Sequence, residues 1–440
     1  MKMWKRTGVA TAAIATVAAL ALSGCGGGTG ATGSSSTSAD GVVNITMWHG
    51  FSEADGKTLE SIVDSFNASQ STYHIDAQLQ PWSTIGETMV TKVLSGDGPD
   101  IVTTGADNGQ GWSIDGTFQC VEDFYQDANS GTGDYLDNVV EQIKFTVDGK
   151  EQHCAVPMGY APTAVWYNTD MWAKAGLTEA DYPKTWDELL EVAKKLTTGD
   201  GTQYGIALPD LGWASFMKGN GTGLFDLDGK VTINSEQNKK FLEKMREFYK
   251  GGYSLTGMDE TMARESFESG QSAMVIVGPW EDQAATDKGI NHDLFPVPPG
   301  DGTYVYPDGT TGSNTGSTGL YWWVTSQVGD SDKLKGIYEF FTWWNNHDNQ
   351  VIWSLGSAYP PNNSTVTPDE LSERPLIAKV AENTDQSFIA IQGLKGGFGD
   401  VVATIDTVSQ NTVRTDDDIQ TLLDEAEAAL QRYLDEFSAE

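Results

Sequence analysis

The sequence predicts an α/β protein built from two lobes of similar size. Between residues 41 and 103, segments with strand-type alternation and segments with helical spacing follow one another in the order β-α-β-α-β. The same alternation returns at residue 163 and continues to residue 277. With 440 residues, the chain is long enough for two lobes that each bury a hydrophobic core.

Hydrophobic periodicity defines the elements of the first lobe. Val43, Ile45 and Met47 alternate with polar residues, as in a strand with one buried face. The segment from Leu59 to Phe66 places apolar residues at i, i+3, i+4 and i+7, as in a helix that packs one face on a sheet. In chain order we expect a strand over 41–47, a helix over 53–69, a strand over 74–79, a helix over 84–94 and a short buried strand over 100–103.

The second lobe repeats these patterns, and Thr185 stands where the N-cap of a helix over 186–196 is expected. The other expected elements are strands over 163–167, 204–208 and 273–277, and helices over 169–175, 235–249 and 261–270. Beyond them, a strand over 320–325, a helix over 331–344 and a long amphipathic helix over 416–437 are expected. The Gly- and Asp-rich stretch over 298–317 is expected to be a surface excursion.

The N-terminus has the features of an export signal. Lys2, Lys5 and Arg6 precede an apolar run over 8–22, which is shorter than the ~20 residues that a membrane span needs. The tetrad Leu22-Ser23-Gly24-Cys25 resembles the bacterial lipobox, so residues 1–24 are expected to be removed and Cys25 to carry lipid. An ordinary signal peptide with a chance cysteine is the alternative. Residues 25–40 are rich in Gly, Ser and Thr and are expected to form a flexible tether.

Charge and cysteine content narrow the function further. The formal net charge of −35 disfavours nucleic acid, because binding to phosphates requires clustered Lys and Arg. Cys120 and Cys154 are an even pair in an exported chain, so a disulfide is expected, with two buried thiols as the alternative. Only His153 lies beside them, so neither a metal site nor a cofactor is expected.

The motifs of common enzymes are missing or incomplete. Residues 51–58 (FSEADGKT) resemble a phosphate-binding loop, but Phe51 occupies the position that requires glycine. Neither a Gly-x-Ser-x-Gly nor a His-Glu-x-x-His motif occurs in the chain. The many acidic residues leave a glycosidase-type carboxylate pair open. We therefore expect no catalytic activity, and we retain a secreted glycoside hydrolase as the alternative of another class.

Aromatic and polar residues follow the predicted strands, where open α/β sheets bind ligands. A sugar has an apolar C–H face and a fringe of hydroxyl groups, so aromatic rings and polar side chains together suit its recognition. Core packing is the alternative for each single tryptophan. The candidate ligand-binding residues are Trp48, His49, Asp107, Asn108, Trp112, Tyr160, Trp213 and Trp280, with Lys395 in the Gly-rich segment 393–399 as a further contact.

Several segments together resemble family 1 extracellular solute-binding proteins of ABC importers, of the maltodextrin-binding type. Besides the lipobox, they are residues 45–50 (ITMWHG), 94–102 (LSGDGPDIV), 165–168 (VWYN), 183–189 (PKTWDEL), 267–274 (FESGQSAM) and 278–280 (GPW). The resemblance implies the two-lobed periplasmic-binding-protein fold of type II, with the ligand in a cleft between lobes. The lobes are then expected to comprise 41–156 with 297–344, and 157–296 with 345–440.

The resemblance also implies roles for single residues. Trp280 matches a tryptophan that stacks on a sugar ring in this family, and Asp107 matches a polar ligand contact. An aromatic residue that the maltodextrin-binding type has shortly before Asp107 is replaced here by Thr103-Thr104. The aromatic residues that can replace this platform are Trp82, Trp112 and Trp213.

We therefore expect a monomeric, lipid-anchored protein that captures an oligosaccharide and delivers it to the membrane permease of an ABC transporter. Its expected location is the extracellular face of the cell membrane of a Gram-positive bacterium. The alternative with the same fold is a receptor for glycerol phosphate or another small solute. That alternative requires Arg or Lys at the cleft loops, and the loops that carry the candidate residues have almost none.

Overall fold

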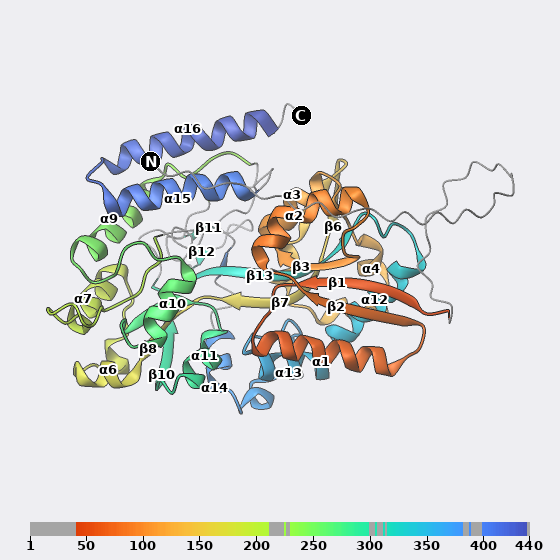
Figure 1. Cartoon of the computed structure of the whole chain (residues 1–440), viewed down its shortest axis with the longest axis horizontal. Helices are drawn as coiled ribbons and strands as arrows, with labels where there is room; N and C mark the ends of the chain where they lie inside the picture. The colour runs from red at the N-terminus through yellow and green to blue at the C-terminus, as the bar shows by residue number, and fades with distance from the viewer. Residues whose placement is uncertain are drawn as a thin grey trace, which may run out of the picture. The chain divides into compact units, whose positions relative to one another are not determined.

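The computed structural model describes residues 41–210, 224–225, 229–298, 304–305, 311–312, 315–381, 387–388 and 398–437 (Figure 1). The expected signal and tether at 1–40, with Cys25, lie outside these residues, as do Trp213 and Lys395. Within the described ranges, no helix has both the length and the apolar character of a membrane span.

The larger sheet of the described chain has seven strands, in the order β14-β13-β3-β1-β2, with β4 and β7 also paired to β13. β1 pairs in parallel with β2 and β3, so the carboxyl ends of these three strands share one edge. β13 lies antiparallel between β3 and β7 (Figure 1). The strands are β1 (Val43–His49), β2 (Tyr73–Leu79), β3 (Ile101–Gly105), β4 (Phe118–Gln119), β7 (Val156–Pro162), β13 (Thr315–Thr325) and β14 (Ser387–Phe388).

Helices cover this sheet with the apolar faces that the sequence predicts. The long helix α1 buries the side chains from Leu59 to Phe66 that show the helical spacing, and α13 packs beside it. The helices of this part are α1 (Ala54–Ser69), α2 (Trp82–Ser95), α3 (Ala106–Ile114), α4 (Glu122–Gln126), α5 (Asp137–Glu141), α12 (Asp332–Trp344) and α13 (His347–Ser357). A short hairpin, formed by β5 (Lys144–Val147) and β6 (Lys150–His153), lies between α5 and β7 in the sequence.

The second sheet is antiparallel and has the order β10-β8-β9, from β8 (Ala164–Asn168), β9 (Met274–Val277) and β10 (His292–Pro296). Only Thr163 separates β8 from β7, so the chain passes directly from one sheet to the other. The helices that follow are α6 (Thr169–Lys174), α7 (Trp186–Leu196), α9 (Glu236–Lys250), α10 (Glu260–Glu268), α11 (Glu281–Asp287), α14 (Pro375–Ala381), α15 (Phe398–Arg414) and α16 (Ile419–Phe437). The short strands β11 (Tyr304–Val305) and β12 (Thr311–Gly312) form a separate hairpin.

Most predicted elements are confirmed, and two are not. Thr185 caps α7 as expected, with its hydroxyl accepting the Glu188 N–H at 3.2 Å. The strand expected over 204–208 is wrong, because only Tyr204 and Ala207 form isolated bridges. Between them, the N–H of Gly205 donates to the Thr197 hydroxyl instead of to a strand. The surface excursion expected over 298–317 is too long, because β13 already begins at Thr315 and pairs with β7 from Ser317 onward.

An ion pair and a disulfide connect strands of the larger sheet to neighbouring segments of the chain. The buried carboxylate of Asp100 accepts the Thr46 N–H of β1 and the Lys333 ammonium of α12, each at 2.8 Å. Cys120, next to β4, is joined by a disulfide to Cys154, which follows β6, 34 residues later. A loop of this length contributes about 3–4 kcal/mol to stability through chain entropy.

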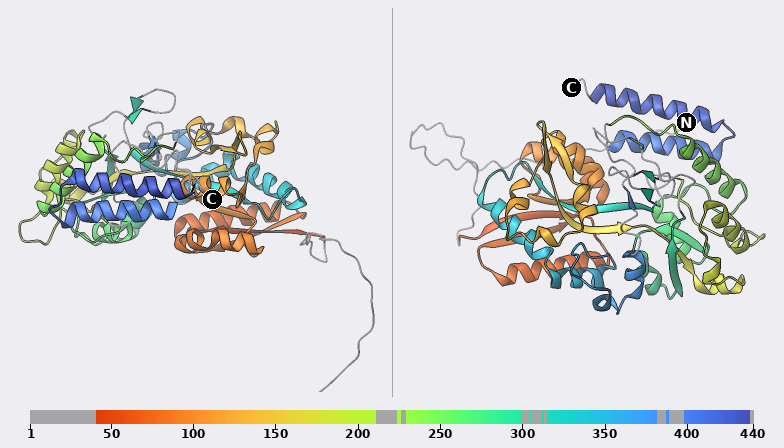
Figure 2. Two further views of the ribbon diagram at one scale, coloured as in Figure 1. Left: turned by 90° about the horizontal axis from the view of Figure 1, so that it is seen from above. Right: turned by 180° about the vertical axis from the view of Figure 1, so that it is seen from behind.

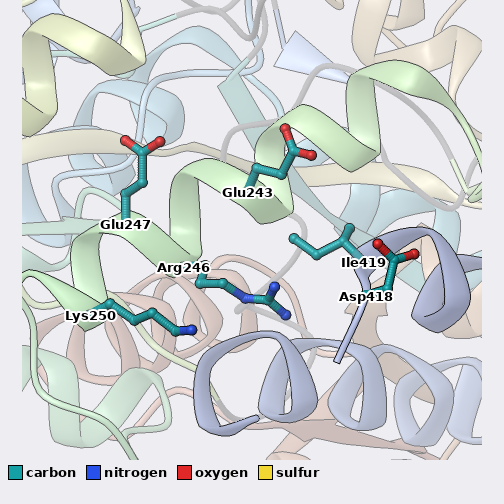
Figure 3. Close-up of a pocket in the computed structure, with 6 residues that line it drawn as sticks. All are labelled: Glu243, Arg246, Glu247, Lys250, Asp418 and Ile419. Atoms are coloured by element: carbon teal, nitrogen blue, oxygen red, sulfur yellow. The ribbon is translucent and has the colours of Figure 1, made fainter. Parts of the chain in front are cut away.

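Arg246 attaches helix α9 to the last turn of α15 and to the connection that follows it. Its guanidinium donates to the carbonyl oxygens of Thr412 and Asp417, both at 2.8 Å. Figure 3 shows this side chain pointing from α9 toward the start of α16. Arg246 lines a surface hollow of about 270 Å³. Since Arg246 is already bonded to backbone, we assign the hollow to packing and not to ligand binding. The two further views in Figure 2 show α15 and α16 running side by side, as their contacts require.

Replacing Arg246 by alanine is expected to lower the free energy of unfolding by about 2 kcal/mol, since hydrogen bonds from a charged donor contribute about 1.5–3 kcal/mol. The matched control is Lys250→Ala on the same helix, which removes only a surface ion pair with Asp416 and is expected to change less than about 1 kcal/mol. Urea denaturation of the three proteins measures both effects. An equal loss in the two variants would show that Arg246 is not a structural tie.

Candidate ligand-binding site

The carboxyl end of β1 carries the first two candidate residues, and both are buried. The indole Nε1 of Trp48 donates to Gln78 of β2 at 3.1 Å. His49 is the last residue of β1, is wholly buried and stacks on Phe51 at 6.1 Å between ring centroids. Burial lowers the pKa of His49 to about 4, so this imidazole is neutral at pH 7.

Trp280 follows the carboxyl end of β9 and is the N-cap residue of helix α11. Its ring folds back over Gly278, where any Cβ would overlap the indole. The ring is partly buried and packs against hydrophobic side chains of both sheets. It also contacts Tyr359, with centroids 5.9 Å apart and ring planes 38° apart. Trp280 therefore lies where the cores of the two sheets meet.

Four side chains form a continuous line of aromatic contacts, which we call the aromatic row: Trp82, Phe51, Tyr359 and Trp280. The centroid distances along it are 5.2, 6.3 and 5.9 Å. The two inner members, Phe51 and Tyr359, are buried, whereas Trp82 is 43% exposed. The row begins at the first turn of α2 beside the larger sheet and ends at α11 beside the second sheet.

A cluster of charged side chains adjoins the row at Trp280. The guanidinium of Arg264 in α10 lies 3.0 Å from Glu281, 3.4 Å from Glu268 and 3.9 Å from Glu53. Glu53 immediately precedes α1, so its contact with Arg264 links a helix of the larger sheet to a helix beside the second sheet. Three carboxylates surround one guanidinium, so the group has no surplus positive charge for an anionic ligand.

Glu281 is the most deeply buried member of this cluster. Its side chain is inaccessible to solvent, and among the described residues only its Oε2 accepts a hydrogen bond, from Arg264. Burial raises the pKa of Glu281 to about 7, although Arg264 opposes the shift. This carboxyl therefore changes its protonation state near neutral pH, directly beside Trp280.

The remaining candidates among the described residues lie in regular structure and not in loops. Asn108 and Trp112 belong to α3, where Trp112 is 7% exposed and contacts Phe118 edge to face at 5.3 Å. Asp107 is in the first turn of the same helix, and its side chain is not described. Tyr160, expected after a turn, lies in β7 opposite Gly319 and is wholly buried. The structure thus connects His49 to Trp280 through Phe51 and Tyr359, while Trp48, Trp112 and Tyr160 belong to a separate core cluster.

Several residues of the site escaped sequence reasoning. Arg264, Glu281 and Tyr359 come from three segments, and only folding brings them together. The sequence could have indicated Glu281 as a residue of the site, because it directly follows the Gly-Pro-Trp motif. Tyr359 stands before Pro360-Pro361 at the end of a helix, which marks a fixed turn. Across the described ranges, no group of three His, Cys, Asp or Glu side chains is arranged to hold a metal ion.

Comparison with known proteins identifies the family of the chain. Residues 50–351 match the family described as bacterial extracellular solute-binding protein. The chain belongs to this family. It is accordingly a solute-binding protein of the type that serves ABC transporters, a receptor and not an enzyme, as the sequence predicts.

Individual relatives of this solute-binding protein are distant. YcjN of Escherichia coli K12, which carries the name of an ABC transporter periplasmic-binding protein, is 26% identical over 62% of this chain and 63% of its own length, just under two thirds. The sn-glycerol-3-phosphate-binding protein UgpB of Rhizobium meliloti is 25% identical over 73% of this chain and 76% of its own. The Thermus thermophilus maltotriose-binding protein, solved with maltotriose, has a TM-score of 0.69 at 18% identity and covers 89% of this chain and 100% of its own. The expected periplasmic-binding-protein fold is thus confirmed.

Replacing Glu281 by glutamine is expected to change how stability depends on pH. A carboxyl whose pKa rises from 4.5 to about 7 on folding binds its proton more tightly in the native state. Its contribution to the free energy of unfolding therefore falls as pH rises through this interval, by roughly 3 kcal/mol in all. The difference between wild type and Glu281→Gln should decline accordingly between pH 4.5 and 7, as measured by urea denaturation.

The neutral His49 acts in the opposite direction over part of the same interval, but it is present in both proteins and cancels in the difference. Glu268→Gln removes another carboxylate beside Arg264 and is the matched control. A pH-independent difference between wild type and Glu281→Gln would contradict the assignment of this titration to Glu281.

Proposed function

We propose that this solute-binding protein captures a neutral carbohydrate, an oligosaccharide, and delivers it to the membrane permease of an ABC transporter. The observation that carries the proposal is the position of Trp280. Its ring is only partly buried, is held over Gly278 and Tyr359, and lies in the turn between β9 and α11. An aromatic face fixed in this way suits the apolar face of a sugar ring.

The charges around Trp280 favour a neutral ligand over an anion. Recognition of a phosphate needs Arg or Lys side chains with free hydrogen-bond donors. Arg264, the cation beside Trp280, is engaged by Glu281, Glu268 and Glu53. Asp55 adds a further carboxylate close to Tyr359. Hydroxyl groups of a sugar can donate hydrogen bonds to such carboxylates, whereas a phosphate would be repelled.

The relatives divide between the two ligand classes. UgpB of Rhizobium meliloti is named for sn-glycerol 3-phosphate, and the Thermus thermophilus protein holds maltotriose. The glycerol phosphate alternative therefore remains the one to test against. Among these ligands, the carboxylates around Arg264 favour the maltotriose type for this chain.

We further propose that the ligand is enclosed between two lobes, comprising 41–156 with 297–344 and 157–296 with 345–440. Contacts to both lobes would stabilise a closed state in proportion to the ligand's differential affinity for it. The chain is also proposed to be anchored through lipid on Cys25, at the extracellular face of the membrane. A single chain of lipid gives only weak attachment, so a second acyl chain or a further contact is expected.

A calorimetric screen of the purified protein tests the ligand class. The panel comprises maltose, maltotriose, maltotetraose, mannobiose, mannotriose and sn-glycerol 3-phosphate. At least one oligosaccharide is expected to bind, and Trp280→Ala to weaken that binding at least about tenfold, about 1.4 kcal/mol. Trp280→Phe keeps an aromatic face and should retain part of the affinity. Binding of sn-glycerol 3-phosphate alone would favour the alternative and contradict the proposal.

Replacing Cys25 by alanine tests the anchor. Without the thiol, no lipid can be attached, so the protein is expected in the medium and not in the membrane fraction of the expressing cells. The released protein should bind ligand with unchanged affinity, because the site lies far along the chain from residue 25. Retention of the variant in the membrane fraction would contradict lipidation at Cys25.

A further inference from the structure

Two lines of contacts join the same two segments of the chain, one just after β1 and one just after β9. The first is the aromatic row, which connects Phe51 to Trp280 through one tyrosine. The second is ionic and runs from Glu53 through Arg264 to Glu281. Phe51 and Glu53 are two residues apart, and Trp280 and Glu281 are consecutive, so both lines begin and end together. The two segments are therefore held by aromatic packing and by charge.

The guanidinium of Arg264 divides its contacts between the two sides. Its Nε donates to Oε2 of the buried Glu281 at 3.0 Å. Its Nη2 lies 3.4 Å from Glu268, on the same helix, and 3.9 Å from Glu53, which precedes α1. Glu281 thus fixes the position of the guanidinium, while Nη2 is shared between a carboxylate beside the second sheet and one beside the larger sheet.

The contact between Arg264 and Glu53 can break at small cost. Losing a partner destabilises strongly only when a buried charge is left unpaired. If Glu53 moves away, Arg264 keeps Glu281 and Glu268 as partners. The side chain of Glu53 is 55% exposed, so water can solvate it when the contact is broken. An ion pair of this kind suits an interface that opens and closes.

Carboxyl groups lie on both sides of this contact. The hydroxyl of the buried Tyr359 is within electrostatic reach of four charged side chains: Asp55, Glu260, Arg264 and Glu53. Glu53 and Asp55 lie at the start of α1, whereas Glu260 begins α10. The guanidinium of Arg264 therefore lies between like charges that would otherwise repel one another across the two sides.

We propose that Arg264 is a positioning residue, whose ion pair with Glu53 holds the lobes closed over a bound ligand. We call this ion pair the latch. The inference rests on the proposed enclosure of the ligand between two lobes and names a residue that stabilises the closed state. Since an enclosed ligand leaves only after the lobes separate, the latch acts mainly on the dissociation rate.

The test measures dissociation and association rates of the full-length protein by stopped-flow tryptophan fluorescence. The ligands are maltotriose, mannotriose and sn-glycerol 3-phosphate, and the one that binds is used for the variants. Glu53→Gln is expected to raise the dissociation rate about threefold, as for a partly exposed ion pair, and to leave the association rate within about twofold. With a neutral sugar, raising NaCl from about 50 to about 500 mM should abolish this difference from wild type.

Glu268→Gln is the matched control, because it removes the other carboxylate from the same Nη2 atom. It leaves Arg264 free to pair with Glu53, so its dissociation rate is expected to equal that of wild type or to be lower. In an Arg264→Gln background, adding Glu53→Gln should change nothing further, because the latch is already absent. Thermal unfolding of each variant identifies any loss of fold.

Small-angle X-ray scattering of the ligand-free proteins provides a readout that needs no ligand. Without the latch the lobes separate more often, so Glu53→Gln should have a larger radius of gyration than wild type. Glu268→Gln should match wild type.

The outcomes separate this inference from the proposed function. Equal dissociation rates and equal radii of gyration in wild type and Glu53→Gln would refute the latch and leave the carbohydrate function intact. Equal increases in Glu53→Gln and Glu268→Gln would also refute it, because the position of the carboxylate would not matter. Binding of sn-glycerol 3-phosphate alone would overturn the carbohydrate function, and the latch is then measured with that ligand. If none of the three ligands binds, the scattering comparison alone decides the latch.

Discussion

The contact between Trp280 and Tyr359 is the interaction on which the proposed site depends. Trp280 belongs to the second sheet by its place after β9, whereas Tyr359 follows α13, which packs on α1 of the larger sheet. Tyr359 is placed by Ala358, whose φ of 67° is in the left-handed region. A non-glycine residue there costs about 1 kcal/mol or more, which the surrounding packing has to offset. The aromatic row thus connects the cores of two sheets through one strained turn.

The charges near this contact restrict what it can bind. A largely covered guanidinium needs paired carboxylates, and Arg264, whose side chain is 17% exposed, has three within 4 Å. The same pairing that makes its burial tolerable removes it as a receptor for phosphate. Glu281 is wholly buried, and this burial raises its pKa to about 7 although Arg264 opposes the shift. An aromatic surface next to surplus carboxylates suits a ligand that is neutral, partly apolar and rich in hydroxyl donors.

Local sequence patterns predicted the elements whose stability is local. The spacing from Leu59 to Phe66 and the N-cap Thr185 each depend on a few neighbouring residues, and both predicted helices are present. β7 was not predicted, because Pro157 and Gly159 are unfavourable in a strand; pairing with β13, more than 150 residues away, stabilises it. Tyr160 lies in β7, so the prediction that it follows a turn is wrong for the same reason. For the site, the Gly-Pro-Trp motif indicated Trp280, but Arg264 and Tyr359 reach it only through tertiary packing.

The most direct measurement of the central claim observes Trp82 and Trp280, the two tryptophans of the aromatic row, while a ligand binds. The protein is labelled with 5-fluorotryptophan, and the ¹⁹F resonances of Trp82 and Trp280 are assigned from the Trp82→Phe and Trp280→Phe variants. A bound oligosaccharide is predicted to shift the Trp280 resonance, because it stacks on the partly buried ring at this end of the aromatic row. Saturation with that oligosaccharide without any change at Trp280 would contradict the account, since the ligand would then occupy another part of the protein.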